Sequence, residues 1–179
     1  SIRRLLAYVA IAQVGCGLVG LLAANEAGVA ALLFWLATLA LALVGGYAVL
    51  AMCRPDNPHL RDLEGLAQRQ PLLALVFALC LASLAGLPPT AGFVGRLYLL
   101  HASLEAGNIS LALLAAGCFP LLFYACARTV VSMFMRRPSA EAPPVVLGAE
   151  ALVVLLLSGL GTLGLGLMPS GLLRAVGET

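Results

Sequence analysis

A single arginine lies within a long apolar stretch of the chain, shortly after two consecutive prolines. Arg96 follows Pro88 and Pro89 in a run that begins after Pro71. The prolines remove two main-chain donors and disfavour helical backbone at the residue before them. Unsatisfied backbone and a buried ion are both costly in hydrocarbon, and both are tolerated where protein or a water-filled cavity covers them. The pattern predicts a broken membrane helix with a charge beside the break, which is a candidate functional site.

Three glycines, Gly86, Gly92 and Gly95, flank the prolines and belong to the predicted break. A plainer interpretation stays open, because proline and glycine also form ordinary kinks and an arginine near a helix end can extend to the interface. If the site is functional, Arg96 should face the bundle interior. Glu105 lies on the opposite side of the same predicted helix, so the expected partner is water, a backbone carbonyl or a residue outside the sequence.

Other ionisable residues are weaker candidates. His101 and Glu105 are four residues apart, so they share a helix face near the outer end. This pair is either a proton exit or an interfacial polar contact. Arg128 lies within the next apolar run and can reach the interface by extending its side chain. The five cysteines include no C-x-x-C pair, so neither a zinc site nor a disulfide framework is indicated.

The composition is that of an integral membrane protein. Hydrophobic residues make up 62% of the chain, charged residues 10%, and the mean hydropathy is +1.05. Soluble domains have about 25% charged residues. The net charge of only +2, with arginines spread over the loops, argues against a nucleic-acid surface.

The chain should form an all-α, polytopic membrane helix bundle with one domain over residues 1–179. Because a span needs about 20 apolar residues, five transmembrane helices are expected, the third broken at Pro88-Pro89. Their predicted ranges are Leu5–Ala24, Ala27–Met52, Pro71 to about Ser103, Ile109 to about Phe134, and Val145–Leu167. The chain starts without methionine and leads directly into a span, so we expect a fragment of a longer protein.

Residues 56–70 interrupt the apolar pattern. Leucines recur at helical spacing between charged residues, Asn57 can cap, and Pro58 suits the first helical position. The segment is either an interfacial amphipathic helix or a solvated helical connector.

Loop charges predict the orientation. In the five-helix arrangement seven loop arginines fall on one side, whereas the other side has Glu26, Glu105 and only Arg174. The positive-inside rule places the amino end in the cytoplasm and the carboxyl end outside. The seven arginines are Arg3, Arg4, Arg54, Arg61, Arg69, Arg136 and Arg137.

Three stretches carry a resemblance to a known family. They are Ser1-Ile-Arg-Arg-Leu-Leu-Ala-Tyr8, Asp62-Leu-Glu-Gly-Leu66, and the central LAGLPPTAGFVGR, which ends at Arg96. The chain resembles the antiporter-like membrane subunits of respiratory complex I, most closely the subunit N type, over nearly its whole length. The resemblance implies the last five helices of a longer subunit.

In that family the residue after G-F-x-G is a lysine on a discontinuous helix and part of a proton path. Here it is Arg96, and lysine is absent from the whole chain. Of the family's Y-Y-Y-L-R segment, Tyr124 and Arg128 remain. A buried lysine can lose its proton, whereas arginine stays charged. Two explanations are open: a drift to arginine with protons carried by neighbouring water and side chains, or a fixed charge in a subunit that does not pump.

The resemblance implies a proton-translocating subunit of NADH:quinone oxidoreductase in the bacterial inner membrane. Its partners would be the other membrane subunits and the lipid bilayer. The chain itself would bind no cofactor, with NADH, FMN, iron-sulfur clusters and quinone handled by other subunits. The alternatives are an antiporter-like subunit of a related hydrogenase or cation/proton antiporter complex, and a non-pumping structural subunit.

Overall fold

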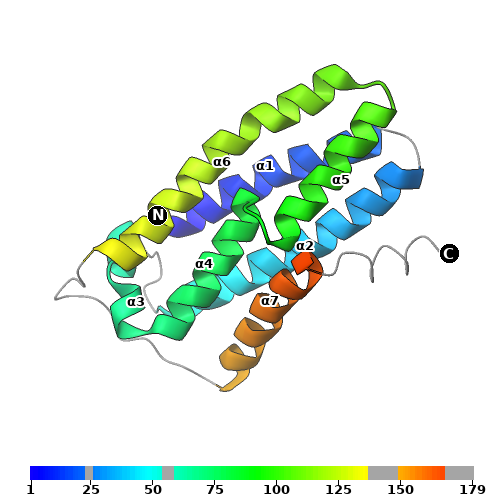
Figure 1. Cartoon of the computed structure of the whole chain (residues 1–179). Helices are drawn as coiled ribbons and strands as arrows, with labels where there is room; N and C mark the ends of the chain where they lie inside the picture. The colour runs from blue at the N-terminus through cyan, green and yellow to red at the C-terminus, as the bar shows by residue number, and fades with distance from the viewer. Residues whose placement is uncertain (23–25, 54–58, 137–148, 168–179) are drawn as a thin grey trace.

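The computed structural model describes residues 1–22, 26–53, 59–136 and 149–167 (Figure 1). These residues form an all-helical bundle without strands in the described ranges, which confirms the predicted fold class. The helices are α1 Ile2–Leu22, α2 Glu26–Met52, α3 Leu66–Arg69, α4 Pro71–Ala85, α5 Ala91–Glu105, α6 Ile109–Met135 and α7 Ala149–Leu167, with a 3-10 turn, η1, at Leu60–Leu63.

Among the residues that the structure describes, three helices are long and apolar enough to cross a membrane by length and composition: α1, the part of α2 over Gly28–Met52, and α6. The helices α4 and α5 have 15 residues each. Each therefore reaches about 22 Å, short of the roughly 30 Å hydrocarbon core. The sequence interpretation of this region as one broken element agrees with these lengths. The count of five crossings and the orientation stay predictions.

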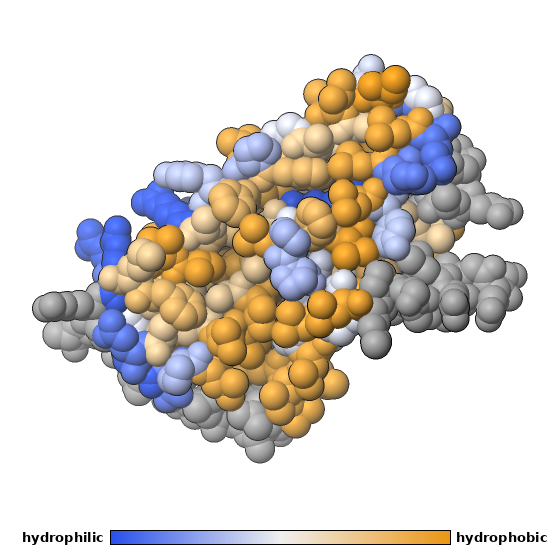
Figure 2. All heavy atoms as spheres, viewed as in Figure 1, coloured by the Kyte–Doolittle hydropathy of each residue, from blue (hydrophilic) through white to orange (hydrophobic). Residues whose placement is uncertain are grey.

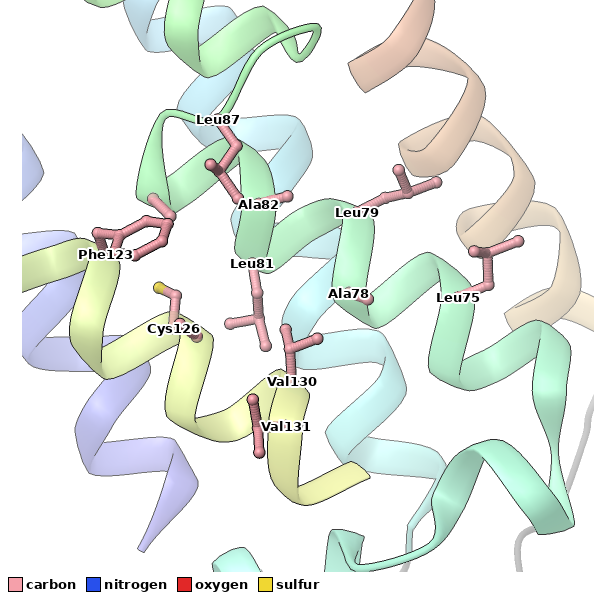
Figure 3. A pocket seen from close by; sticks show the side chains of 12 residues that line it. Leu75, Ala78, Leu79, Leu81, Ala82, Leu87, Phe123, Cys126, Val130 and Val131 are labelled. Atoms are coloured by element: carbon pink, nitrogen blue, oxygen red, sulfur yellow. The ribbon is translucent and has the colours of Figure 1, made fainter. Parts of the chain in front are cut away.

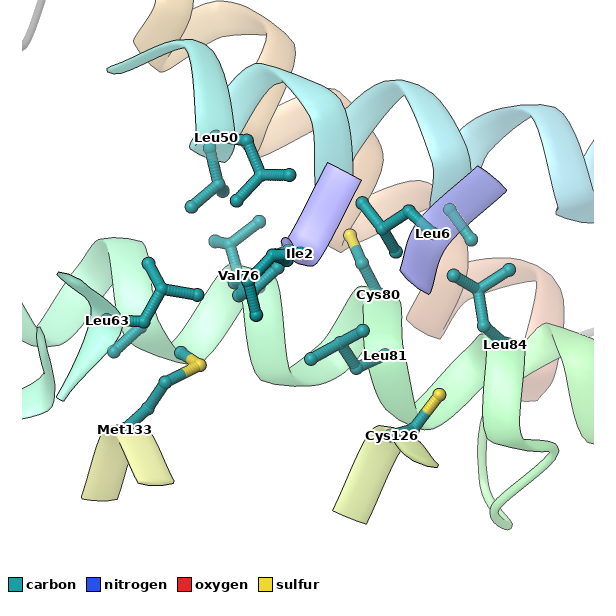
Figure 4. Close-up of a cluster of buried hydrophobic side chains, with 14 of the residues drawn as sticks. Ile2, Leu6, Leu50, Leu63, Val76, Cys80, Leu81, Leu84, Cys126 and Met133 are labelled. Carbon is teal, nitrogen blue, oxygen red and sulfur yellow. The ribbon is translucent and has the colours of Figure 1, made fainter. Parts of the chain in front are cut away.

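The helix α2 lies at the centre of the bundle and packs against α1, α4, α5 and α7. Its Gly45 lets α4 and α7 approach closely, because an added Cβ would lie 2.6 Å from Cys80 Sγ and Ser158 Cβ. Small residues at helix contacts are typical of membrane bundles. A large apolar cluster, in which Leu6, Leu50 and Leu81 are buried, joins α1, α2 and α4 (Figure 4). This packing fixes the position of α4 and therefore of the break at its end.

The break lies between α4 and α5, as predicted, near the middle of the bundle (Figure 1). The helix α4 ends at Gly86, which has a left-handed φ of 75°. Leu87 N–H donates to Ala82 O and Gly86 N–H to Ser83 O, the two bonds of a Schellman motif. The following peptide bond, Pro88-Pro89, is cis. The helix begins again at Ala91 and continues to Glu105, two residues beyond the predicted end.

The segment predicted as one amphipathic helix over 56–70 is not continuous. Within its described part, the 3-10 turn η1 and the single-turn helix α3 are separated at Gly65, whose φ of 66° is left-handed and interrupts the helix. The amide of His59 donates to Asp62 Oδ2 at 2.7 Å and caps the first turn. The predicted caps Asn57 and Pro58 lie outside the described residues.

Candidate functional site

Arg96 lies inside the bundle and contacts the end of the preceding helix. Its side chain is 3% exposed. The Nη1 atom donates to Ala85 O at 2.6 Å, and Nη2 donates to Leu84 O. The last carbonyls of a helix have no intrahelical partner and carry partial negative charge. The end of α4 therefore stabilises the cation. The side chain faces the bundle interior as expected, and of the three kinds of partner left open by the sequence the structure shows backbone carbonyls.

Two aromatic rings complete the surroundings of the guanidinium. Its central carbon lies 4.6 Å from the ring centroid of Phe119 and 5.6 Å from that of Trp35. Both distances are within the range of cation–π attraction. Trp35 belongs to α2 and Phe119 to α6, so four helices meet at this one charge: α2, α4, α5 and α6.

A fifth helix contributes Gln13, which the sequence analysis missed. This α1 side chain is completely buried, and its Nε2 donates to Leu84 O at 2.6 Å. Trp35 Nε1 in turn donates to the main-chain oxygen of Gln13 at 3.3 Å. The signal was present in the sequence, because an amide inside an apolar membrane run needs a polar partner.

The three predicted glycines let the elements around Arg96 approach closely. A Cβ at Gly86 would lie 2.3 Å from Arg96 Nη1, and one at Gly92 would lie 2.0 Å from Ser83 O. At Gly95 it would lie 2.9 Å from the Trp35 ring. A larger side chain at any of these positions would displace backbone, an aromatic ring or the guanidinium itself.

The prolines are not among the residues that surround Arg96. Pro88 and Pro89 are both exposed, and between them and α5 the hydroxyl of Thr90 donates to Leu87 O at 2.6 Å. The prolines therefore belong to the connection between α4 and α5 and make none of the described contacts with Arg96.

A pocket of about 290 Å³ lies beside Arg96, between α5 and α6. Water occupies about 30 Å³ in the liquid, so the volume accommodates several molecules. Both Pro120 and Ala116 line the pocket. Because proline has no N–H, Ala116 O lacks its usual helical partner. The pocket thus combines a cation with a helix segment that has lost one internal hydrogen bond.

The other predicted residues lie elsewhere. His101 Nδ1 and Glu105 Oε2 are 3.6 Å apart, on side chains that are 70% and 53% exposed. Neither residue lines the pocket of Arg96. Tyr124 and Arg128 are also exposed and line other pockets beside α6. Arg96 therefore lies at the break, whereas the side chains of the other predicted residues, His101, Glu105, Tyr124 and Arg128, lie outside its pocket.

Within the part of the chain that the structure describes, Arg96 forms no ion pair with a carboxylate; His101–Glu105 and Arg136–Glu64 are ion pairs formed elsewhere. The same residues contain no group of three or more His, Cys, Asp or Glu that could hold a metal ion. Arginine remains charged in proteins. At this site neutral carbonyls and aromatic rings surround a guanidinium beside a pocket large enough for water.

A helical membrane bundle that buries a charge beside a broken helix defines a polytopic membrane protein with an ion inside its core, and comparisons with known proteins give the family. The profile described as NADH:quinone oxidoreductase/Mrp antiporter, TM, matches residues 1–120. The chain therefore belongs to the NADH:quinone oxidoreductase/Mrp antiporter family of transmembrane proteins.

Curated relatives agree with this assignment. NADH-quinone oxidoreductase subunit N of Desulforamulus reducens is 36% identical over 174 residues, which are 96% of this chain and 36% of the relative. The protein of the same name from Rhodococcus opacus is 34% identical over 177 residues, covering 97% of this chain and 33% of the relative. The chain thus spans about a third of the length of these two relatives.

Solved structures show the same fold. A chain of respiratory complex I from Thermus thermophilus matches with a TM-score of 0.77 and 29% identity, over 98% of this chain and 46% of that one. A chain of the Mrp complex from Dietzia sp. matches with a TM-score of 0.83 and 26% identity, over 96% of this chain and 41% of that one.

Proposed function

We propose that this chain is part of a proton-translocating membrane subunit of an NADH:quinone oxidoreductase. The observation that carries the proposal is the burial of Arg96 at the carbonyl end of α4, beside a pocket large enough for water. The similarity to subunit N of two bacteria supports it. NADH, FMN, iron-sulfur clusters and quinone would be handled by partner subunits.

In this proposal Arg96 does not carry the proton. A guanidinium does not lose its proton in a protein, so proton transfer passes through water in the neighbouring pocket. The fixed positive charge of Arg96 raises the energy of a proton that passes nearby, and this repulsion is strong where the local dielectric constant is low. Arg96 therefore acts as an electrostatic barrier whose height depends on how closely the α4 carbonyls surround it.

The test is the number of protons translocated per electron in membranes that contain Arg96→Ala, Arg96→Lys or the control Arg61→Ala. Arg61 is an exposed arginine of η1 that does not line the pocket. The ratio should change strongly in Arg96→Ala, stay closest to the parent value in Arg96→Lys, and be unaffected in the control. An unchanged ratio in an assembled Arg96→Ala complex would make the charge structural and favour a non-pumping subunit.

A second candidate function is that of an antiporter-like subunit in a cation/proton antiporter complex. The match to a chain of the Mrp complex, with a TM-score of 0.83 and 26% identity, and the family profile that names the Mrp antiporter support this candidate. The two functions are separated by one pair of measurements on membrane vesicles. A complex I subunit requires NADH-dependent quinone reduction for proton movement, whereas an antiporter moves protons in response to a sodium gradient alone.

A further inference from the structure

Four polar residues form a stripe along α6. Tyr124, Arg128 and Ser132 follow one another on α6 at intervals of four residues, and Arg136 is the residue directly after the helix, so each member of the stripe adjoins the next. The rest of this helix is predominantly apolar, and 67% of Tyr124 is exposed, as are both arginines. Polar groups on a membrane helix are costly unless another polar group covers them. The stripe therefore needs a covering partner.

All four residues of the stripe line one pocket of about 310 Å³. It contains two guanidinium groups, a phenol and a hydroxyl. One of the cations is paired, because Arg136 Nη1 donates to Glu64 Oε1 at 2.7 Å. Arg128 forms none of the described ion pairs. Arg128 therefore has no counter-ion in the described part of the chain, whereas Arg136 is paired with Glu64. This uncompensated positive charge favours an anionic ligand.

Ser132 gives an independent indication of a ligand. This residue is only 2% exposed, yet its hydroxyl has no hydrogen-bond partner among the described residues. A buried hydroxyl without a partner costs free energy. Ser132 lines the same pocket as the two arginines, so rotation of its side chain toward the pocket would let one bound acceptor satisfy both the hydroxyl and the uncompensated charge.

An apolar groove of about 340 Å³ continues from this pocket between α4 and α6 (Figure 3). The two cavities share Phe123, Ala127 and Val131. Along α4 the groove extends from Leu75 to Ala85. This distance is about 15 Å along the helix axis, half of a hydrocarbon core of roughly 30 Å. The groove therefore has the length of the hydrocarbon part of one lipid leaflet.

Surface hydropathy agrees with a site of two parts. Figure 2 shows hydrophobic residues over most of the face that contains α4 and α6, with hydrophilic residues at both ends of the bundle, one group of them near α3 and the end of α6. Basic pockets between membrane helices, next to apolar surface, are typical binding places for anionic lipid headgroups.

We propose that the pocket and the groove together bind one anionic phospholipid. The phosphate lies between Arg128 and Arg136 and accepts a hydrogen bond from Ser132, while one acyl chain fills the groove. The ligand is a lipid rather than a free anion because the apolar groove continues directly from the polar pocket. A helix of a partner subunit fits less well, since the groove ends at the break in mid-bundle.

The experiment uses the protein purified from its own membranes in mild detergent. Native mass spectrometry counts the phospholipids that remain on each chain after delipidation, followed by rebinding from vesicles of phosphatidylglycerol or phosphatidylcholine with the same acyl chains. The parent protein should retain one phospholipid and rebind phosphatidylglycerol in preference to phosphatidylcholine. Soluble glycerol phosphate should not compete.

Two variants separate the parts of the site. Arg128→Gln combined with Arg136→Gln should weaken phosphatidylglycerol binding at least about tenfold, the effect expected from losing charged hydrogen bonds. Ala127→Phe should block the groove and weaken binding of both lipids. The controls are Arg61→Gln, an exposed arginine outside both cavities, and Gly117→Phe, whose Cβ would have no neighbour within 4 Å.

Three results would overturn the proposal. Equal binding of the two lipids would remove the role of the arginines, and displacement by glycerol phosphate would reduce the site to a free-anion site. Crosslinking from a photoreactive residue at position 124 to another polypeptide, rather than to lipid, would show that a partner subunit covers the stripe. Thermal unfolding of each variant, compared with its control, separates lost binding from lost folding.

Discussion

Arg96 and Gln13 donate hydrogen bonds to the same oxygen atom, the carbonyl of Leu84. The two side chains come from α5 and α1, which are far apart in sequence, and both are buried. Gln13 Oε1 has no hydrogen-bond partner among the described residues. A shared acceptor places an uncharged amide next to the guanidinium. Replacing the amide NH2 group with an oxygen atom, as in Gln13→Glu, therefore adds a negative charge beside the guanidinium while the volume of the side chain stays nearly the same.

The first prediction uses this relationship. Gln13→Glu places a carboxylate beside Arg96 and should neutralise much of its field, because opposite charges within a few ångströms attract strongly when buried. Proton translocation per electron should then change in the same direction as in Arg96→Ala. Gln13→Leu is the matched control: it removes the amide but leaves the charge, and should cost about 1 kcal/mol of stability. Equal numbers of protons translocated per electron in Gln13→Glu and Gln13→Leu would contradict the prediction.

The second prediction compares two glycines with the same backbone conformation. Gly86 has a φ of 75° and Gly107 a φ of 77°, but only at Gly86 would a Cβ meet another group, Arg96 Nη1 at 2.3 Å. Gly107→Ala should cost about 1 kcal/mol, the price of a left-handed alanine. Gly86→Ala should cost at least about twice as much, because the buried guanidinium must also leave its carbonyl partners.

Thermal unfolding of the purified protein measures both variants of this pair. The cost of a left-handed alanine is common to Gly86→Ala and Gly107→Ala. The difference between their unfolding temperatures therefore measures the cost of displacing Arg96. Equal unfolding temperatures would show that the guanidinium can move without lowering the free energy of unfolding, and that its contacts with the carbonyls contribute little stability.

The third prediction concerns orientation. Gln68 and Ala106 are exposed, and they lie near opposite ends of the bundle, in α3 and after α5 (Figure 1). The loop arginines predict position 68 in the cytoplasm and position 106 outside. A membrane-impermeant maleimide applied to intact cells should label Ala106→Cys above the parent background and leave Gln68→Cys unlabelled until the cells are opened. Labelling of both from outside would overturn the five-crossing arrangement.

The sequence was sufficient to predict the broken helix and the buried charge. Consecutive prolines have only a few tolerated positions in a helix, and an arginine in an apolar run must find polar partners. The position of Arg96 next to a helix end follows from these two constraints. The structure adds that Gly86 ends α4 before the prolines are reached.

The partners of Arg96 were beyond the sequence analysis. Trp35 and Phe119 lie in runs that are apolar on every side, so periodicity does not distinguish the inward face from the lipid-facing one. Gln13 was detectable as an isolated amide, but its partner Leu84 O is a main-chain atom freed by the end of another helix. The interruption at Gly65 was missed for a different reason: the leucine spacing continues across a residue whose φ of 66° interrupts the helix.

The separation of Arg96 from its hydrogen-bond acceptors has one more consequence. The charge belongs to α5, whereas Leu84 O and Ala85 O belong to α4, and the two helices are joined only through the break. Sliding one helix along the other therefore moves a cation relative to its own solvation shell. Such a displacement would perform electrical work, so we expect any helix movement at the break to change the local potential while the arginine keeps its proton.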